Sequence, residues 1–126
     1  MSIDFERVTP IFRIFSVDKA KEFYVDFLGF KIDWEHRFEV GAPLYMQISR
    51  GKLVIHLSEH YGDCCPGSTA FVTMSGIEEF HREVSSKRYP YLHPGLGMTP
   101  WNAKCMEVID PFGNHIRFNE YLRHAE

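Results

Sequence analysis

The stretch KCMEVIDPFGNHIRFNEY, residues 104–121, decides the fold of this chain. Its centre, Asp110-Pro111-Phe112-Gly113-Asn114, combines proline, glycine and two Asx residues, which are the residue types that form tight turns. The flanking runs, Lys104 to Ile109 and His115 to Tyr121, are rich in residues that favour strands. The pattern therefore predicts a β-hairpin near the end of the chain.

Upstream of this hairpin, the sequence predicts one strand and one helix. The strand is the run STAFVTM, which begins at Ser68. In the helix that follows, Ser75 and Glu78 have the spacing of a capping box. Its apolar residues repeat at spacings of three and four: Ile77, Phe80 and Val84. The helix ends before Tyr89-Pro90, since the residue before a proline disfavours helical backbone, and a loop rich in glycine and proline leads to the hairpin.

The first half of the chain has a similar order. Thr9 to Ser16 reads as a strand, and a helix then runs from Asp18 to a typical C′ glycine, Gly29. The apolar residues of this helix have helical spacing: Ala20, Phe23, Tyr24, Phe27 and Leu28. Three strand-like runs follow: Lys31 to Phe38, Leu44 to Ser49 and Leu53 to Ser58. The sequence therefore predicts an α+β fold, a single domain over 1–126 built from two similar βαβββ modules, about 8–60 and about 68–121.

The composition excludes several classes of protein. The chain has 126 residues and a net charge of −3, with 44% hydrophobic and 25% charged residues, which is typical of one globular domain. It has no apolar run near the roughly 18 to 20 residues that span a membrane. No basic cluster indicates a nucleic acid partner. Three cysteines, two of them adjacent at Cys64 and Cys65, form a poor disulfide framework, so we expect free thiols and a cytoplasmic protein.

Two motifs resemble those of a known superfamily. Phe23-Tyr24 followed by Leu28-Gly29-Phe30 resembles the FY…LGF pattern of the vicinal oxygen chelate (glyoxalase/bleomycin resistance/dioxygenase) superfamily, and Asp110-Pro111-Phe112-Gly113-Asn114 resembles its DP-x-GN turn. The resemblance extends from about Val8 to Tyr121. It implies paired βαβββ modules that form a curved mixed sheet around a cleft.

Within this superfamily, three further stretches are similar to the bleomycin resistance proteins. They are Pro10-Ile11-Phe12-Arg13, Pro100-Trp101 and Ile116-Arg117-Phe118. This resemblance implies a binding protein without turnover that sequesters a cationic aromatic glycopeptide antibiotic. It also implies a homodimer with clefts at the subunit interface. The modest charge of −3 departs from the marked acidity of such proteins.

Candidate ligand-binding residues come from the resemblance and from strand alternation. The resemblance implies that Tyr45 and Trp101 sandwich the flat rings of the drug. Alternation places His56 and Arg117 on the cleft faces of their strands. The whole candidate set is Tyr45, Trp101, Trp34, Phe38, Phe71, His56 and Arg117. A purely structural role stays open for three of them: His56 as a core histidine, Trp101 as a loop cover and Tyr45 as part of a dimer interface.

The residues at the metal positions of the superfamily argue against a metal. The resemblance places the four ligands of metal-dependent relatives at Thr9, His56, Thr69 and Arg117. Of these, His56 alone is a comfortable ligand, and the guanidinium of Arg117 repels a cation. We therefore expect no metal, no cofactor and no catalytic residue, with His56 as the one weak candidate ligand.

Two alternatives remain open from the sequence. The first is a metal-dependent glyoxalase- or dioxygenase-type enzyme with a departed metal site centred on His56. The second is a binding module for another flat or cationic metabolite, for which the same cleft would serve. Acidic residues near the predicted cleft would attract such a ligand: Glu35, Glu39, Glu59, Asp63 and Glu107.

Overall fold

The first half of the chain forms a four-stranded sheet in the computed structural model, which describes residues 2–122. The strand order is β1-β4-β3-β2, with β1 parallel to β4 and the other pairs antiparallel. The elements are β1 (Ile11–Arg13), α1 (Val17–Lys21), the π-helix η1 (Glu22–Phe27), β2 (Lys31–His36), β3 (Tyr45–Arg50) and β4 (Leu53–Ser58). Two predicted strands are shorter than expected: β1 covers three residues, and β2 ends at His36, so Phe38 lies in the following loop.

The second half forms a sheet of the same topology, with strand order β5-β8-β7-β6 and β5 parallel to β8. The elements are β5 (Thr69–Thr73), α2 (Ile77–Ser85), β6 (Gly97–Met98), β7 (Ala103–Ile109) and β8 (His115–Tyr121). The predicted hairpin is confirmed as β7 and β8. The sequence did not predict β6, because two residues, one of them glycine, carry no alternating pattern.

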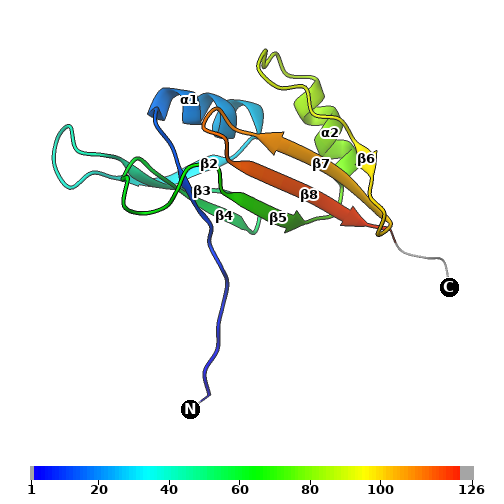
Figure 1. Ribbon diagram of the computed structural model, residues 1–126, viewed down its shortest axis with the longest axis horizontal. Coiled ribbons are helices and arrows are strands. Elements are labelled where there is room, and N and C mark those ends of the chain that lie inside the picture. Colours follow the sequence, from blue (N-terminus) through cyan, green and yellow to red (C-terminus); the bar gives the residue numbers. More distant parts are fainter. Residues whose placement is uncertain (1, 123–126) are drawn as a thin grey trace.

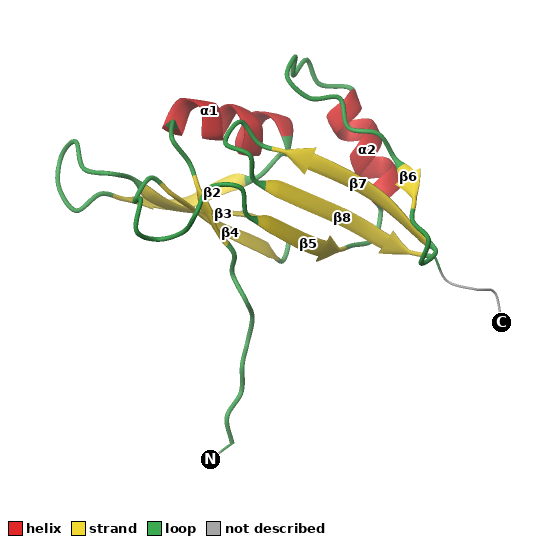
Figure 2. Cartoon of the chain, viewed as in Figure 1, coloured by secondary structure: helices red, strands yellow, loops and turns green. Residues whose placement is uncertain are grey.

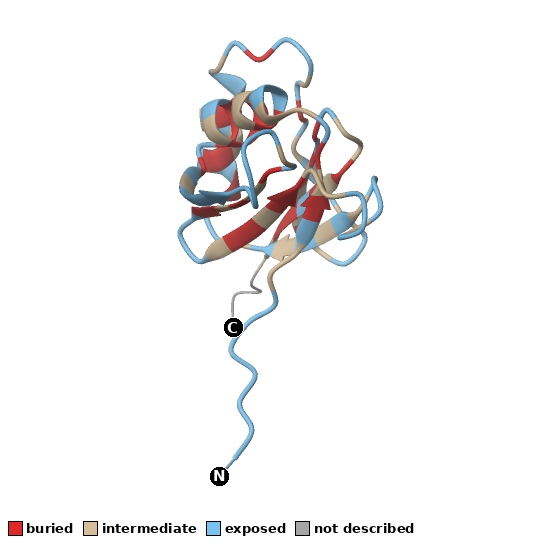
Figure 3. Ribbon diagram, turned by 90° about the vertical axis from the view of Figure 1, so that its left-hand side faces the viewer, coloured by how far each residue is buried: buried red, intermediate tan, exposed pale blue. Residues whose placement is uncertain are grey.

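Both helical segments lie on the same side of the two sheets, and the N-terminal residues leave on the opposite side (Figures 1 and 2). Buried residues lie on the helices and on the strands of both sheets (Figure 3). The core that they form includes Ile55 on β4 and Phe118 on β8. By strand alternation, the neighbouring His56 and Arg117 face away from the helices. We call this side of both sheets the open face. Over residues 2–122, no helix is long and apolar enough to cross a membrane.

The two motifs that carry the resemblance meet in the core. The buried hydroxyl of Tyr24 donates to Oδ2 of Asp110 at 2.6 Å. Asp110 also accepts from the backbone N–H groups of Phe112 and Asn114 at 2.9 and 2.8 Å, and from Nδ2 of Asn114 at 2.8 Å. Nδ2 of Asn114 also donates to the carbonyl of Arg13 at 2.8 Å. The hairpin turn therefore joins the second module to the first helix and to β1.

The first helix is not uniformly α-helical, in contrast to the prediction. After one α-helical turn it continues as η1, in which the N–H of Leu28 donates to the carbonyl of Phe23, five residues back, at 2.9 Å. The predicted apolar stripe is confirmed, since Phe23, Tyr24 and Leu28 are all fully buried. Gly29 ends the helix with a φ of +79°, as its sequence position predicts.

The predicted capping box of α2 is wrong. The N-cap residue is Gly76, in the left-handed region, and no side chain of its own helix caps it. Instead, Oε1 of Glu120 on β8 accepts from the N–H groups of Gly76 and Ile77 at 3.0 and 2.9 Å. Glu78, the expected capping partner, forms an ion pair with Lys104 on β7. A carboxylate from another element therefore satisfies the helix start, which local spacing cannot predict.

Candidate functional site

Three aromatic rings cluster on the open face of the first sheet. Trp34 stacks on Tyr45, with ring centroids 6.0 Å apart and an interplanar angle of 11°. His56 meets both rings edge-on, at 5.5 Å from Trp34 and 5.2 Å from Tyr45. They come from neighbouring strands β2, β3 and β4, so the sheet itself sets their spacing. We call Trp34, Tyr45 and His56 the aromatic triad.

A hollow of about 410 Å³ opens beside the triad. Six residues line it: Trp34, His36, Phe38, Tyr45, His60 and Asp63. Phe38 stands edge-on between His36 and His60, at 4.9 and 5.9 Å. Five of the six lining side chains therefore carry aromatic rings, and the sixth, Asp63, is the one carboxylate of the lining. Such a surface suits a flat ligand that carries positive charge.

A β-bulge in β2 turns Trp34 toward Tyr45 and His56. The register of β2 against β3 shifts between Ile32 and Trp34, so that Ile32 pairs with Ile48 and Trp34 pairs with Gln47. Asp33 is the extra residue. Because a bulge places two residues of one strand opposite one residue of the next, Asp33 and Trp34 both reach Gln47. Strict alternation along β2 would have placed Asp33 and Trp34 on opposite faces of the sheet.

A continuous chain of hydrogen bonds runs across the open face of this sheet. Nε2 of Gln47 donates to Oδ2 of Asp33 at 3.0 Å. Oε1 of the same amide lies 3.0 Å from Nε2 of His56. Nδ1 of His56 lies 2.7 Å from the hydroxyl of Tyr45. The chain therefore fixes the imidazole and, through it, the Tyr45 ring.

The pKa shifts at the site keep the triad uncharged. Burial lowers the pKa of His56, and the nearby charge of Arg7 lowers it further. Burial raises the pKa of Tyr45, helped by the negative charge of Asp63. Both groups are therefore neutral at neutral pH, while Asp63 accepts from the Ser58 hydroxyl at 2.6 Å.

The four positions that the superfamily uses for a metal do not form a metal site here. Both ring nitrogens of His56 are occupied by Tyr45 and Gln47. Arg117 is held by Glu107, with Nε to Oε2 at 2.7 Å. The remaining two positions are threonines, and within residues 2–122 no three His, Cys, Asp or Glu side chains gather to hold an ion. The described donor set therefore does not match a catalytic zinc or iron centre.

The other three candidate residues belong to the second module. Phe71 and Arg117 are cross-strand neighbours on β5 and β8. Trp101 is exposed in the turn between β6 and β7. The structure thus brings Trp34, Phe38, Tyr45 and His56 together, and it places Phe71, Arg117 and Trp101 in the other half of the chain. The single chain does not unite the two groups around the hollow.

The polar open face of the second sheet is organised by Glu107. This carboxylate accepts from Arg117 and lies 3.5 Å from Nδ1 of His115. The Arg117 guanidinium and neighbouring groups lower the pKa of Glu107. Arg117 is therefore paired with a carboxylate, which offsets part of its positive charge.

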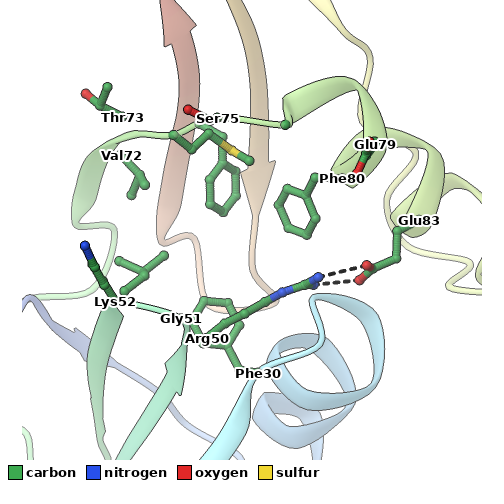
Figure 4. Close-up of a pocket in the computed structure, with 14 residues that line it drawn as sticks. Phe30, Arg50, Gly51, Lys52, Val72, Thr73, Ser75, Glu79, Phe80 and Glu83 are labelled. Atoms are coloured by element: carbon green, nitrogen blue, oxygen red, sulfur yellow. Dashed lines mark hydrogen bonds and ion pairs between the residues drawn. The ribbon is translucent and has the colours of Figure 1, made fainter.

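A second hollow, of about 510 Å³, lies where the β3–β4 turn meets the start of α2 (Figure 4). The Arg50 guanidinium crosses it and binds Glu83 on α2 through two contacts of 2.6 and 2.8 Å. Arg50 also donates to the carbonyl of Leu28 at 2.7 Å. The hydrogen bonds from Arg50 lower the pKa of Glu83. The sequence analysis did not single out Arg50, which ties the first module to the helix of the second.

Two further residues of the site were not predicted from the sequence. Gln47 and Asp33 carry the hydrogen-bond chain, yet neither was a candidate. Alternation along the predicted third strand was a usable signal for Gln47, because it shares a face with Tyr45. No sequence signal marks Asp33, since its place depends on the bulge.

With this geometry in view, comparison with known proteins places the chain in a family. Residues 1–124 match the glyoxalase superfamily protein family, so the chain belongs to the glyoxalase superfamily. The predicted fold class and the resemblance are both confirmed. No curated protein sequence matches the chain.

Several solved structures share the fold. One is a bleomycin-binding protein from Streptomyces verticillus, complexed with copper(II)-bleomycin, with 24% identity and a TM-score of 0.70 over 97% of this chain and 100% of that one. Another is a bleomycin resistance determinant encoded on transposon Tn5, with 19% identity and a TM-score of 0.70 over 94% and 100%. A third is a glyoxalase-related enzyme from Clostridium phytofermentans, with 19% identity and a TM-score of 0.75 over 95% and 98%.

Proposed function

We propose that this protein binds a flat, cationic small molecule of the bleomycin type and sequesters it without turnover. The observation that carries the proposal is the stacked pair of Trp34 and Tyr45 beside an open hollow that contains Asp63. Stacking on such rings contributes about 0.5–1.5 kcal/mol per contact beyond the buried area. A carboxylate within the same hollow favours a ligand with positive charge.

Similar solved structures support this choice of ligand. One is a bleomycin-binding protein complexed with bleomycin, with 21% identity, and another is TnmS3, described as an antibiotic-binding protein, with 18% identity. The fold is shared with a glyoxalase-related enzyme as well. The aromatic lining and the occupied nitrogens of His56 are what favour binding over catalysis in this chain.

We further propose that the binding cleft is completed in a homodimer. The N-terminal arm, residues 2–9, extends from the open face of the sheets (Figure 1). Its apolar side chains are 85% (Ile3), 94% (Phe5) and 91% (Val8) exposed, so the arm presents apolar surface that a partner could cover. A second copy of the chain would cover this arm. The second copy would then close the hollow of the first copy with its own Phe71, Trp101 and Arg117.

We propose that the protein works in the cytoplasm and needs no cofactor. Its three cysteines are free thiols in the structure, which suits a reducing compartment. His56, the weak candidate ligand, has no free lone pair for a metal while Tyr45 and Gln47 hold it. An enzyme with a departed metal site stays the alternative, and stoichiometric divalent metal in protein purified without a His-tag would favour it.

Fluorescence titration with metal-free bleomycin tests the binding proposal. The chain has two tryptophans, so Trp101→Phe leaves Trp34 as the single reporter and Trp34→Phe leaves Trp101. We expect saturable quenching of Trp34 at micromolar or lower drug. An unchanged Trp34 signal up to high micromolar drug would reject the proposal.

Deletion of residues 2–8 tests the dimer. Light scattering should show a dimer for the full chain and a monomer for the shortened one, because the arm supplies exposed apolar surface for the partner. The shortened chain should also bind bleomycin more weakly. A full chain that is monomeric at the concentrations where it binds the drug would contradict the dimer proposal.

A further inference from the structure

We infer that Gln47 and Asp33 set the hydrogen-bonding polarity of the hollow, so that Tyr45 presents an acceptor and the site selects ligands with hydrogen-bond donors over ligands with acceptors. The ligand class rests on the proposed function, whereas the proton positions rest on the hydrogen-bond chain alone. The chain of hydrogen bonds runs from the Asp33 carboxylate to the hollow.

Asp33 fixes the orientation of the Gln47 amide. Its carboxylate accepts from the Ser49 hydroxyl and from Nε2 of Gln47, both at 3.0 Å, and Lys31 lies 3.5 Å away. The hydrogen bonds from Gln47 and Ser49 lower the pKa of Asp33, so it is ionised at neutral pH. An ionised carboxylate only accepts. A flipped amide would direct its carbonyl at that carboxylate, so Gln47 must donate to Asp33.

The Gln47 amide in turn fixes the tautomer of His56. Oε1 of Gln47 then points to Nε2 of His56, at 3.0 Å, and an amide oxygen only accepts. Nε2 must therefore carry the proton. In a neutral imidazole, which burial favours here, Nδ1 is then a bare acceptor.

The tautomer fixes the hydroxyl of Tyr45. Nδ1 of His56 lies 2.7 Å from this hydroxyl, so the hydroxyl must donate to it. The Tyr45 oxygen has no other proton, and toward the hollow it offers only lone pairs. Tyr45 therefore donates to His56, His56 donates to Gln47, and Gln47 donates to Asp33. Every proton of these hydrogen bonds is directed away from the ligand.

The remaining surfaces near the triad have the same polarity. The ring faces of Trp34 and Phe38 are electron-rich, and Asp63 is an acceptor. His36 and His60, on either side of Phe38, and the indole N–H of Trp34 are the groups of the lining that can donate. A flat amidinium matches this surface. A carboxylate of the same shape would meet the Tyr45 oxygen with no proton between them, which costs binding energy.

Two measurements test the inference, and they separate it from the proposed function. The first is ligand-free: ¹⁵N NMR of the His56 ring in the full chain. We expect a protonated Nε2 and a bare Nδ1. Gln47→Met removes both amide contacts and should produce a mixture of tautomers. Ser49→Ala removes the other neutral donor to Asp33, keeps Gln47 in place and serves as the matched control, with an unchanged ring.

The second measurement compares benzamidine with benzoate at about pH 8, where ordinary imidazoles are neutral. We expect the wild-type chain and Ser49→Ala to bind benzamidine about tenfold or more tightly than benzoate, and Gln47→Met to show a smaller but remaining preference, because Asp63 still favours the cation. The preference falls because the Tyr45 hydroxyl becomes free to donate toward the ligand.

Each other outcome overturns part of the inference. A wild-type ring with its proton on Nδ1, or a charged ring, overturns the proton order whichever probe binds. A preference for benzoate overturns the ligand class while leaving a binding function intact. If neither probe binds at millimolar concentration and the ring still has Nε2 protonated, the ligand class fails together with the proposed use of this hollow, and the proton order stands.

Discussion

Replacement of Tyr24 by phenylalanine isolates the hydrogen bond that joins the two sequence motifs. The Tyr24 hydroxyl donates to Asp110 at 2.6 Å, and both groups are buried. Burial, followed by the charge of Asp110, raises the pKa of Tyr24 well above its usual value, so the hydroxyl stays protonated and can donate at all ordinary pH.

The expected loss of stability follows from the hydrogen bonds that Asp110 keeps after the substitution. A hydrogen bond to a charged group contributes about 1.5–3 kcal/mol, and its loss leaves a buried carboxylate with one donor fewer. Asp110 keeps its three contacts from Phe112 and Asn114. We therefore expect Tyr24→Phe to lower the free energy of unfolding by about 2 kcal/mol. For 126 residues, with an unfolding entropy of about 2.1 cal/mol/K per residue, this corresponds to a fall in Tm of about 8 °C.

Urea unfolding followed by circular dichroism measures the change directly. Tyr61→Phe is the matched control, since Tyr61 is 89% exposed and the same oxygen is removed there. The control should lie within about 0.5 kcal/mol of wild type. If Tyr24→Phe also falls within that margin, the Tyr24–Asp110 contact does not hold the modules together and the reasoning is refuted.

Three further predictions concern the site and the junction of the modules. Trp34→Ala should weaken bleomycin binding about tenfold or more in a calorimetric titration, with an unchanged circular dichroism spectrum. If the protein is a dimer, Trp101→Ala should have the same effect. A variant that binds as tightly as the wild type would show that its tryptophan is not part of the site. Gly29→Ala should lower the free energy of unfolding by about 1–2 kcal/mol, because φ is +79° and the new Cβ would lie 2.6 Å from Nη1 of Arg50; a neutral effect in urea would contradict this. Arg50→Met should lose more stability at neutral pH than in acid. The pKa of Glu83 is lowered in the folded state, so the ion pair contributes above the unfolded-state pKa and is lost as the pH falls toward the lowered one, whereas the contact of Arg50 with the Leu28 carbonyl does not titrate; a gap in unfolding free energy that is the same at about pH 7 and at about pH 3 would contradict this.

The fold was accessible from the sequence because its signals are local. The turn at Asp110-Pro111-Phe112-Gly113-Asn114 and the helical spacing of Phe23, Tyr24 and Leu28 both depend on near neighbours in the chain. The features that the prediction missed depend on distant ones. Glu120 caps α2 from another element, and the backbone of η1 widens where Tyr24 reaches Asp110.

The site was only partly accessible for a similar reason. Alternation predicted the facing of His56, and the resemblance singled out Tyr45, but the facing of Trp34 depends on one extra residue in β2. The hydrogen-bond chain through Gln47 follows from cross-strand register, which the sequence does not specify. The distance between the triad and Phe71 depends on how the modules join, and no periodic pattern encodes that.

The central claim, sequestration without turnover, is tested most directly by calorimetric titration of the wild-type chain with metal-free bleomycin, followed by mass analysis of the recovered drug. The account expects saturable heat near one drug per chain, no stoichiometric metal in the protein and drug of unchanged mass. An absence of binding heat at high micromolar drug, or recovered drug with an altered mass, would contradict it.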